Sequence, residues 1–258
     1  MRNNLPVLID FDGIINIGGK PAEDAKEFLA FLTENKIPSH IISNSTLRTS
    51  KDVKTFLKEN SIQSNISIMT TVDASYNYVK KNYKKISVYC DEKIREVFSE
   101  FIDDKNAEAV VIGDLGSGWN YETMNEIFRK VFEGAEIVAM QKNKYWKPDG
   151  QNLALDAGAF ISAIEYSSSK RSILIGKPSK IYFQMALESL GSYIAKPFVM
   201  IGDDVENDVT AAQKYGGSGI LVYTGKTKYP LPEDYSPRPN FEAKNLTEVI
   251  QMLSKILN

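Results

Sequence analysis

Short apolar runs alternate with helix-like segments along this chain, and that alternation most constrains its fold. Three such runs fall at residues 5–9, 37–42 and 66–69, each short enough for a buried strand. Between the first two, apolar side chains recur at helical spacing within residues 22–35. Strands that alternate with amphipathic helices predict a parallel sheet covered by helices. We therefore expect an α/β fold with helices on both faces of its sheet.

The same alternation restarts near residue 74. Three apolar runs are separated there by helical patterns, at residues 86–90, 109–112 and 136–140. Residues 74–171 are therefore expected to form a second, smaller α/β unit. Three further runs follow it, at residues 172–175, 198–201 and 220–223. We expect these runs to rejoin the first sheet before a closing helix at residues 246–257.

Composition and charge exclude several classes of function. The net charge of −2 offers no general attraction to nucleic acid or to an anionic membrane. No apolar run approaches the roughly 18 residues that cross a bilayer, and the N-terminal run is too short for a signal peptide. The single cysteine, Cys90, rules out an internal disulfide and fits a reducing compartment. We expect a cytoplasmic protein with no nucleic-acid or membrane partner.

Histidine and cysteine are too scarce to supply common catalytic centres. His40 is the only histidine and lies within an apolar run, which favours a structural role. Cys90 precedes Arg95 at a spacing one residue shorter than that of the loop in cysteine-dependent phosphatases. Cys90 is therefore interpreted as a small residue at a strand end.

A pair of carboxylates closes the first apolar run. Asp10 and Asp12 are separated by one residue and followed by Gly13. Alternate residues of an extended segment point to the same side, so both carboxylates can face one point. The alternative is an Asp-rich turn that bonds its own backbone at a strand end. Distant parts of the chain must decide between these interpretations.

Four predicted strand ends carry polar side chains. They are Asp10 with Asp12, Ser43 with Asn44, Lys177, and Asp203 with Asp204 and Asp208. Functional groups of open parallel sheets gather beyond the carboxyl ends of the strands. Each end by itself has a routine explanation, such as a helix N-cap or a surface lysine. Their coincidence favours a reaction centre.

This set of motifs resembles that of the haloacid dehalogenase superfamily, and the resemblance covers the whole chain. The four family motifs are matched by Asp10-Phe11-Asp12-Gly13, by Ser43-Asn44, by Lys177 in a Gly-Lys-Pro-Ser sequence, and by Gly202-Asp203 with Asp208. The long insert between the second and third motifs is similar to the subfamily with a type-II α/β cap, which includes nitrophenylphosphatases and phosphoglycolate phosphatases. The resemblance implies a Rossmann-like core from residues 1–73 and 172–258, with residues 74–171 as the inserted cap domain.

The resemblance also implies a role for each motif residue. Asp10 is the expected nucleophile that forms an aspartyl-phosphate, and Asp12 the expected general acid and base. The expected phosphate-binding residues are Asp12, Gly13, Ser43, Asn44 and Lys177. The expected Mg²⁺ ligands are Asp10, the backbone carbonyl of Asp12, Asp203 and, through a water, Asp208, with Asp204 as a candidate assistant.

Substrate specificity is expected from the insert, because the four motifs contact only phosphate and metal. By resemblance, a loop containing Asp156 and Gly158 faces the leaving group. An equally supported interpretation makes Asp156 a helix N-cap. The resemblance also makes a homodimer through the cap a reasonable expectation.

Together these observations predict a Mg²⁺-dependent phosphatase that hydrolyses a small phosphorylated metabolite through an aspartyl-phosphate. One alternative is a phosphatase of the same subfamily acting on inorganic pyrophosphate, phospholysine or phosphohistidine. Another is a regulatory or binding protein with little catalysis. The presence of both Asp10 and Asp12 favours an enzyme, because a binding module does not need both.

Overall fold

The computed structural model describes residues 5–146, 152–192, 194 and 196–256, which divide into two compact units. The first unit comprises residues 1–43, 50–69 and 177–258. The second comprises residues 44–49 and 70–176. The chain thus leaves the first unit after its early strands and returns to it at Lys177.

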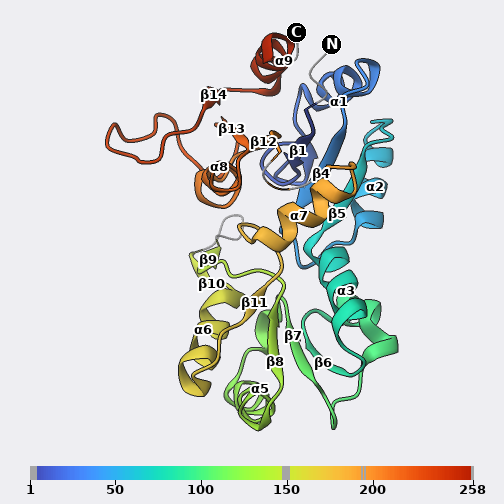
Figure 1. The fold of residues 1–258 in the computed structure, drawn as a ribbon, viewed down its shortest axis with the longest axis vertical. Coiled ribbons are helices and arrows are strands. Elements are labelled where there is room, and N and C mark those ends of the chain that lie inside the picture. Colours follow the sequence, from blue (N-terminus) through green and yellow to red (C-terminus); the bar gives the residue numbers. More distant parts are fainter. Residues whose placement is uncertain (1–4, 147–151, 193, 195, 257–258) are drawn as a thin grey trace. The chain divides into compact units, whose positions relative to one another are not determined.

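A six-stranded sheet forms the centre of the first unit (Figure 1). Its strands lie in the order β14 (Phe241–Ala243), β13 (Ser218–Val222), β12 (Val199–Gly202), β1 (Val7–Asp10), β4 (Ser39–Ser43) and β5 (Ser67–Thr70). β1 pairs in parallel with both β4 and β12. All four residues of β1 are buried, as expected for a central strand of a parallel sheet.

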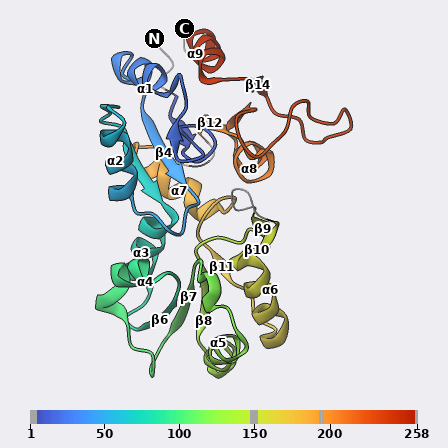
Figure 2. The same ribbon diagram turned by 180° about the vertical axis from the view of Figure 1, so that it is seen from behind.

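Helices cover both faces of this sheet. One face packs against α1 (Ala25–Glu34), α2 (Ser50–Glu59) and α9 (Leu246–Ile256) through a shared apolar cluster that includes Ile220 and Val222. On the opposite face, Leu221 packs against a π-helical turn (Val205–Thr210), which continues as α8 (Ala211–Lys214). α7 (Lys180–Glu188) lies in front of the sheet in Figure 1 and behind it in the reverse view of Figure 2.

A four-stranded parallel sheet forms the centre of the second unit. Its strands lie in the order β11 (Ile173–Leu174), β8 (Glu136–Ala139), β7 (Ala109–Ile112) and β6 (Ile86–Tyr89). α5 (Tyr121–Glu133) and α6 (Ala157–Ser168) bury Ile127 and Ile161 in one cluster with Val110 and Ile112. The α/β fold with helices on both faces of a parallel core sheet is therefore confirmed.

Short elements complete both units. The second unit also contains α3 (Thr71–Asn82), α4 (Glu92–Arg95), 3₁₀ helices at Glu96–Phe101 and Gly116–Gly118, and a hairpin of β9 (Tyr145–Trp146) with β10 (Ala154–Leu155). In the first unit, β2 (Asn16–Ile17) and β3 (Lys20–Pro21) form an antiparallel hairpin directly after β1.

One predicted strand lies in the other sheet. The run at residues 172–175 was expected to rejoin the first sheet, but β11 pairs with β8 of the second sheet. This pairing continues beyond the strand, because the Ile175 and Gly176 N–H groups donate to the carbonyls of Ala139 and Met140. The prediction failed because an apolar run does not specify which sheet edge it will join.

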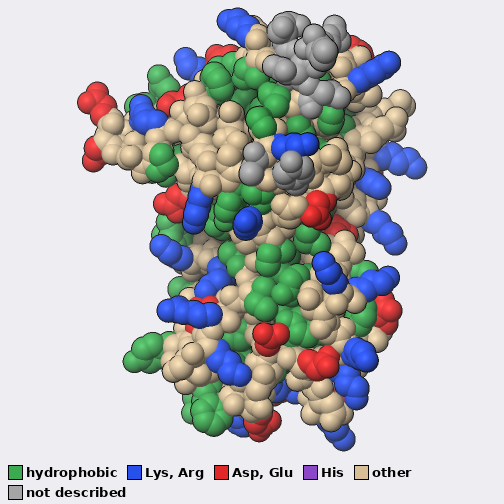
Figure 3. Space-filling view, viewed as in Figure 1, with side chains coloured by type: hydrophobic (Ala, Val, Ile, Leu, Met, Phe, Trp, Pro, Cys, Tyr) green, Lys and Arg blue, Asp and Glu red, His purple; other side chains and the backbone are tan. Residues whose placement is uncertain are grey.

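The surface carries charges of both signs. On the face shown in Figure 3, Lys and Arg side chains are interspersed with Asp and Glu side chains, in keeping with the small net charge. Among the described residues, no helix combines the length and hydropathy that a membrane span requires.

Candidate active site

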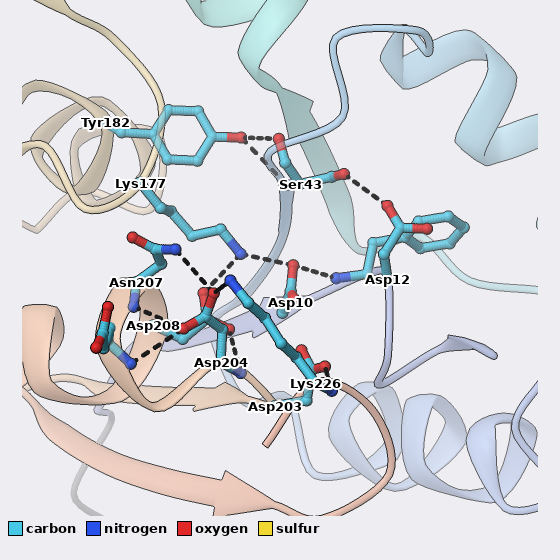
Figure 4. Close-up of polar contacts among 12 residues, drawn as sticks. Asp10, Asp12, Ser43, Lys177, Tyr182, Asp203, Asp204, Asn207, Asp208 and Lys226 are labelled. Atoms are coloured by element: carbon cyan, nitrogen blue, oxygen red, sulfur yellow. Dashed lines mark hydrogen bonds and ion pairs between the residues drawn. The ribbon is translucent and has the colours of Figure 1, made fainter. Parts of the chain in front are cut away.

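A buried lysine joins two carboxylates at the carboxyl edge of the first sheet (Figure 4). Lys177 Nζ lies 2.6 Å from Asp10 Oδ1 and 2.7 Å from Asp208 Oδ1. Asp10 ends β1, Asp208 lies in the π-helical turn after β12, and Lys177 begins the segment that leads to α7. Their side chains are 8%, 1% and 3% exposed, respectively. Charges this deeply buried are tolerated only when they are paired.

A third acid gives this cluster an excess of negative charge. Asp10, Asp203 and Asp208 each place one carboxylate oxygen within 4.8 Å of the others. Burial raises the pKa of Asp10 to about 7, that of Asp203 to about 6 and that of Asp208 to about 8. Burial alone would lower the pKa of Lys177, but Asp10 and Asp208 outweigh it and raise that pKa. Three converging carboxylates beside one ammonium group form a suitable site for a metal cation.

Gly13 lets the turn after β1 approach the Asp203 side chain closely. It has a positive φ of 89°, and a Cβ there would overlap the Asp203 carboxylate. The Gly13 N–H donates to the Asn16 carbonyl at 2.7 Å. The role of Gly13 in phosphate binding stays a prediction. What the structure shows is that glycine is required here for the close approach to Asp203.

Asp12 and Ser43 form a second contact next to this cluster. Ser43 Oγ donates to Asp12 Oδ2 at 3.1 Å, which joins the end of β4 to the turn after β1. Asp10 and Asp12 therefore have different partners: Asp10 contacts Lys177, and Asp12 contacts Ser43.

Tyr182 supports the Ser43 end of the site, a role that no sequence pattern indicated. Its hydroxyl oxygen lies 2.7 Å from the Ser43 carbonyl and 2.9 Å from the Met69 carbonyl, and it accepts from the Ser43 N–H at 3.1 Å. It thereby fixes the ends of β4 and β5 from α7. A tyrosine on the apolar face of a helix gave no signal beyond core packing.

Asp204 lies outside the three-carboxylate group. One of its oxygens accepts from the Glu206 and Asn207 N–H groups at 3.0 and 3.1 Å, so it caps the turn that carries Asp208. Its other oxygen accepts from the Asn207 side chain at 2.8 Å and from Lys226 Nζ. Burial would raise the Asp204 pKa, but Lys226 outweighs it and lowers that pKa. Lys226 is a second residue whose contact at the site no sequence pattern indicated.

The remaining predicted site residues belong to the second unit. Asp156 caps α6 by accepting from the Ala157 N–H at 2.7 Å and also accepts from Gln141 Nε2 at 2.5 Å, so the N-cap interpretation describes its contacts. Gly158 leaves room for the backbone of Lys142 and Asn143. Asn44 also falls in this unit. Roles for these three in binding substrate stay predictions.

The residues interpreted as structural are buried. Cys90 follows β6, and burial raises the pKa of its thiol to about 12. His40 Nδ1 lies 2.9 Å from Ser67 Oγ and 2.6 Å from Ser189 Oγ, which links β4 to β5 and to the end of α7.

Comparison with known proteins identifies the family. A model described as haloacid dehalogenase-like hydrolase matches residues 7–101, and a HAD-hydrolase-like model matches residues 174–249. Haloacid dehalogenase-like hydrolase domain-containing protein 2 of Mus musculus is 31% identical over 246 residues, which cover 95% of this chain and 93% of that protein. The chain belongs to the haloacid dehalogenase-like hydrolase family. The resemblance of its four motifs to this family is thereby confirmed.

Two further proteins are similar over nearly the whole chain. The phospholysine phosphohistidine inorganic pyrophosphate phosphatase of Bos taurus is 28% identical over 254 residues, covering 96% of this chain and 93% of that protein. The solved structure of p-nitrophenyl phosphatase from Archaeoglobus fulgidus shares the fold, with a TM-score of 0.86 at 22% identity over 96% of this chain and 98% of that one.

Proposed function

We propose that this hydrolase is a Mg²⁺-dependent phosphatase that acts on a small phosphate monoester through an aspartyl-phosphate. The observation that carries the proposal is the Lys177 ammonium between Asp10 and Asp208, 2.6 and 2.7 Å from their oxygens and beside Asp203. A strand-end carboxylate held against a buried lysine is suited to attack phosphorus while the lysine stabilises charge on the phosphoryl oxygens.

The donor set fits Mg²⁺ because it consists of carboxylate oxygens. Asp10, Asp203 and the backbone carbonyl of Asp12 are the proposed ligands, and Asp208 is proposed to act through a water. When bound, the ion supplies positive charge that offsets the repulsion between these carboxylates and a phosphate dianion.

In the first proposed step, an Asp10 oxygen forms a bond to phosphorus and the bond from phosphorus to the leaving-group oxygen breaks. Asp12 gives its proton to that oxygen, so the product leaves as an alcohol. Lys177 and the Ser43 hydroxyl bind phosphoryl oxygens during the transfer. Such preorganised charge is the main source of catalysis in phosphoryl transfer.

In the second proposed step, Asp12 takes a proton from a water molecule as the water oxygen bonds to phosphorus. The bond from phosphorus to Asp10 breaks, which releases inorganic phosphate and restores the Asp10 carboxylate. Asp12 then again carries the proton that the next cycle needs.

The proposal is tested by Asp10→Asn. We expect Mg²⁺-dependent release of phosphate from 4-nitrophenyl phosphate to fall by at least about 10³-fold, because an amide is a poor nucleophile. Asp234→Asn makes the same chemical change in an exposed loop and should leave the rate unchanged. Near-normal turnover by Asp10→Asn would rule out this nucleophile.

The substrate class is proposed to be set by residues 74–171, as a cap domain in which Asp156 and Gly158 contact the leaving group. Residues 147–151 of this segment lie outside the described residues. A screen with Mg²⁺ should include sugar phosphates, phosphoglycolate, pyridoxal phosphate and pyrophosphate, since one relative is named as a pyrophosphate phosphatase. A flat profile would favour the binding-protein alternative. Dimerisation through the cap and a cytoplasmic location are further proposals.

A further inference from the structure

Asn16 contacts Asp12 at the turn after β1. Asn16 Nδ2 donates to Asp12 Oδ1 at 2.7 Å. The other oxygen, Asp12 Oδ2, accepts from Ser43 Oγ at 3.1 Å. The two oxygens of this half-buried carboxylate are therefore held by donors from different elements, namely β2 and the end of β4.

The main chain fixes the position of Asn16. Its N–H donates to the Phe11 carbonyl at 2.8 Å, and its carbonyl accepts from the Gly13 N–H at 2.7 Å. Asn16 also pairs with Pro21 across the β2–β3 hairpin. Because the backbone is bonded on both sides and the side chain is only 6% exposed, the amide is held at a defined place beside Asp12.

The Asn16 amide is not explained by stability alone. Its Oδ1 is buried and has no hydrogen-bond partner among the described residues. A buried acceptor without a partner is unfavourable, and an apolar side chain would avoid that loss. The favourable contact of this side chain is therefore made by its NH₂ group, which donates to Asp12.

We propose that Asn16 is a positioning residue that holds Asp12 in the orientation needed for acid–base catalysis. An amide NH₂ group can only donate, so Asp12 Oδ1 must accept from it. A serine hydroxyl both donates and accepts, so Oδ2, beside Ser43, is the oxygen that gives and takes the proton. This inference rests on the proposed phosphatase function, in which Asp12 protonates the leaving group and activates water.

The test compares two substrates in Asn16→Ala. An alkyl phosphate has a leaving group that needs a proton, whereas 4-nitrophenolate leaves without one. The kcat/KM value covers substrate binding and the first chemical step but not the second, so it should fall by about 10-fold for the alkyl phosphate and change little for 4-nitrophenyl phosphate. The kcat for 4-nitrophenyl phosphate should also fall, because water activation in the second step still needs Asp12.

Two further variants separate positioning from folding. Asn16→Asp keeps the size but places a carboxylate against Asp12, so it should lose at least as much alkyl phosphatase activity as Asn16→Ala. Ile17→Ala changes the neighbouring, 39% exposed residue of the same hairpin and should match the wild type on both substrates. Thermal unfolding of every variant verifies that each is folded at the assay temperature.

The outcomes separate the inference from the function on which it rests. An equal loss of kcat/KM for both substrates in Asn16→Ala, or no loss for either, overturns the positioning role. A wild-type protein that hydrolyses neither substrate in the presence of Mg²⁺ overturns the proposed phosphatase function instead.

Discussion

The two parallel sheets of this hydrolase carry different side chains at their carboxyl ends: buried carboxylates in the first and neutral, packed residues in the second. In the first, β1 ends in Asp10, β12 is followed by Asp203, and both lie in the buried carboxylate group next to Lys177. In the second, β6, β7 and β8 are followed by Cys90, Gly113 and Met140. A Cβ on Gly113 would lie 3.0 Å from the Cys90 Cβ and 2.8 Å from the Met140 sulfur, so these strand ends pack against one another.

This difference shows that a parallel sheet does not by itself create a site. Where strand ends are closed by neutral, packed side chains, the sheet serves as a framework. Where strand ends carry more acidic than basic side chains, burial leaves an excess of negative charge. A cation bound together with the substrate can neutralise that charge. The same architecture therefore has two uses in one chain.

The largest contrast in stability is expected when one carboxylate-paired lysine is replaced in each unit, Lys177 in the first and Lys142 in the second. Lys177→Met leaves Asp10 and Asp208 buried without their counter-charge, so we expect the free energy of unfolding to fall by about 3–5 kcal/mol. Lys142→Met should cost only about 1–2 kcal/mol, because Glu165 keeps the Ser172 N–H and hydroxyl as donors at 2.8 and 2.6 Å. Urea unfolding measures both. Equal losses would contradict the distinction between the two sheets.

The next contrast uses a glycine beside each set of strand ends. Gly13→Ala must adopt a positive φ and displace Asp203, so we expect a loss of at least about 2 kcal/mol in unfolding free energy and loss of phosphate release. Gly113→Ala meets the flexible Met140 side chain and, at 3.0 Å, the Cys90 Cβ, so it should cost only about 1–2 kcal/mol, with phosphate release retained. An active Gly13→Ala enzyme would show that Asp203 does not need its present position.

The carboxylate cluster and Glu165 should respond to pH with opposite sign. The pKa values of Asp10, Asp203 and Asp208 are raised to about 7, 6 and 8, so their stabilising contribution is full below about pH 4 and is lost as pH rises to about 8. Burial would raise the Glu165 pKa, but Lys142 and Ser172 outweigh it and lower that pKa. The stability that Glu165 contributes is therefore present above the ordinary pKa of a glutamate and is lost as pH falls.

Mg²⁺ should counteract the loss of stability that the carboxylate cluster shows as pH rises. Thermal unfolding with MgCl₂ and with EDTA should show greater stabilisation by the ion at about pH 8 than at about pH 5, because protons compete for the same oxygens. Stabilisation that is equal at both pH values would place the ion away from Asp10, Asp203 and Asp208.

The smallest expected effect concerns the packed end of the second sheet. The Cys90 thiol has its pKa raised to about 12 and is buried, so alkylation of the folded protein at about pH 8 should be far slower than after unfolding in urea. Phosphate release should be unchanged while the folded protein is treated with the alkylating reagent. Rapid alkylation with loss of activity would mean that this end is open.

Local patterns predicted the elements more reliably than their assembly. The run at residues 109–112 is β7 with the same bounds, and the closing helix expected at residues 246–257 is α9, with the bounds Leu246–Ile256. Both follow from side-chain periodicity, which is a local property. The strand predicted at residues 172–175 joined the other sheet, because pairing depends on which edge is open when the whole chain has folded.

The site shows the same difference between features that local sequence patterns predict and features that depend on tertiary contacts. Asp10, Lys177, Asp203 and Asp208 were recognised because charged residues at strand ends are unusual, and the structure brings them together. Asn16 and Tyr182 gave no such signal, since an asparagine in a turn and a tyrosine on a helix are ordinary. Their contacts with Asp12 and Ser43 join residues that only the fold places side by side.

The sequence by itself determined the fold class, the family and the chemical groups of the candidate centre, because periodicity and motif spacing are written along the chain. Tertiary structure decided which carboxylates share the lysine, which oxygen of Asp12 faces Ser43, and which sheet is closed by packed side chains. These features depend on distances between atoms far apart in sequence, and burial then sets how strongly the charges interact.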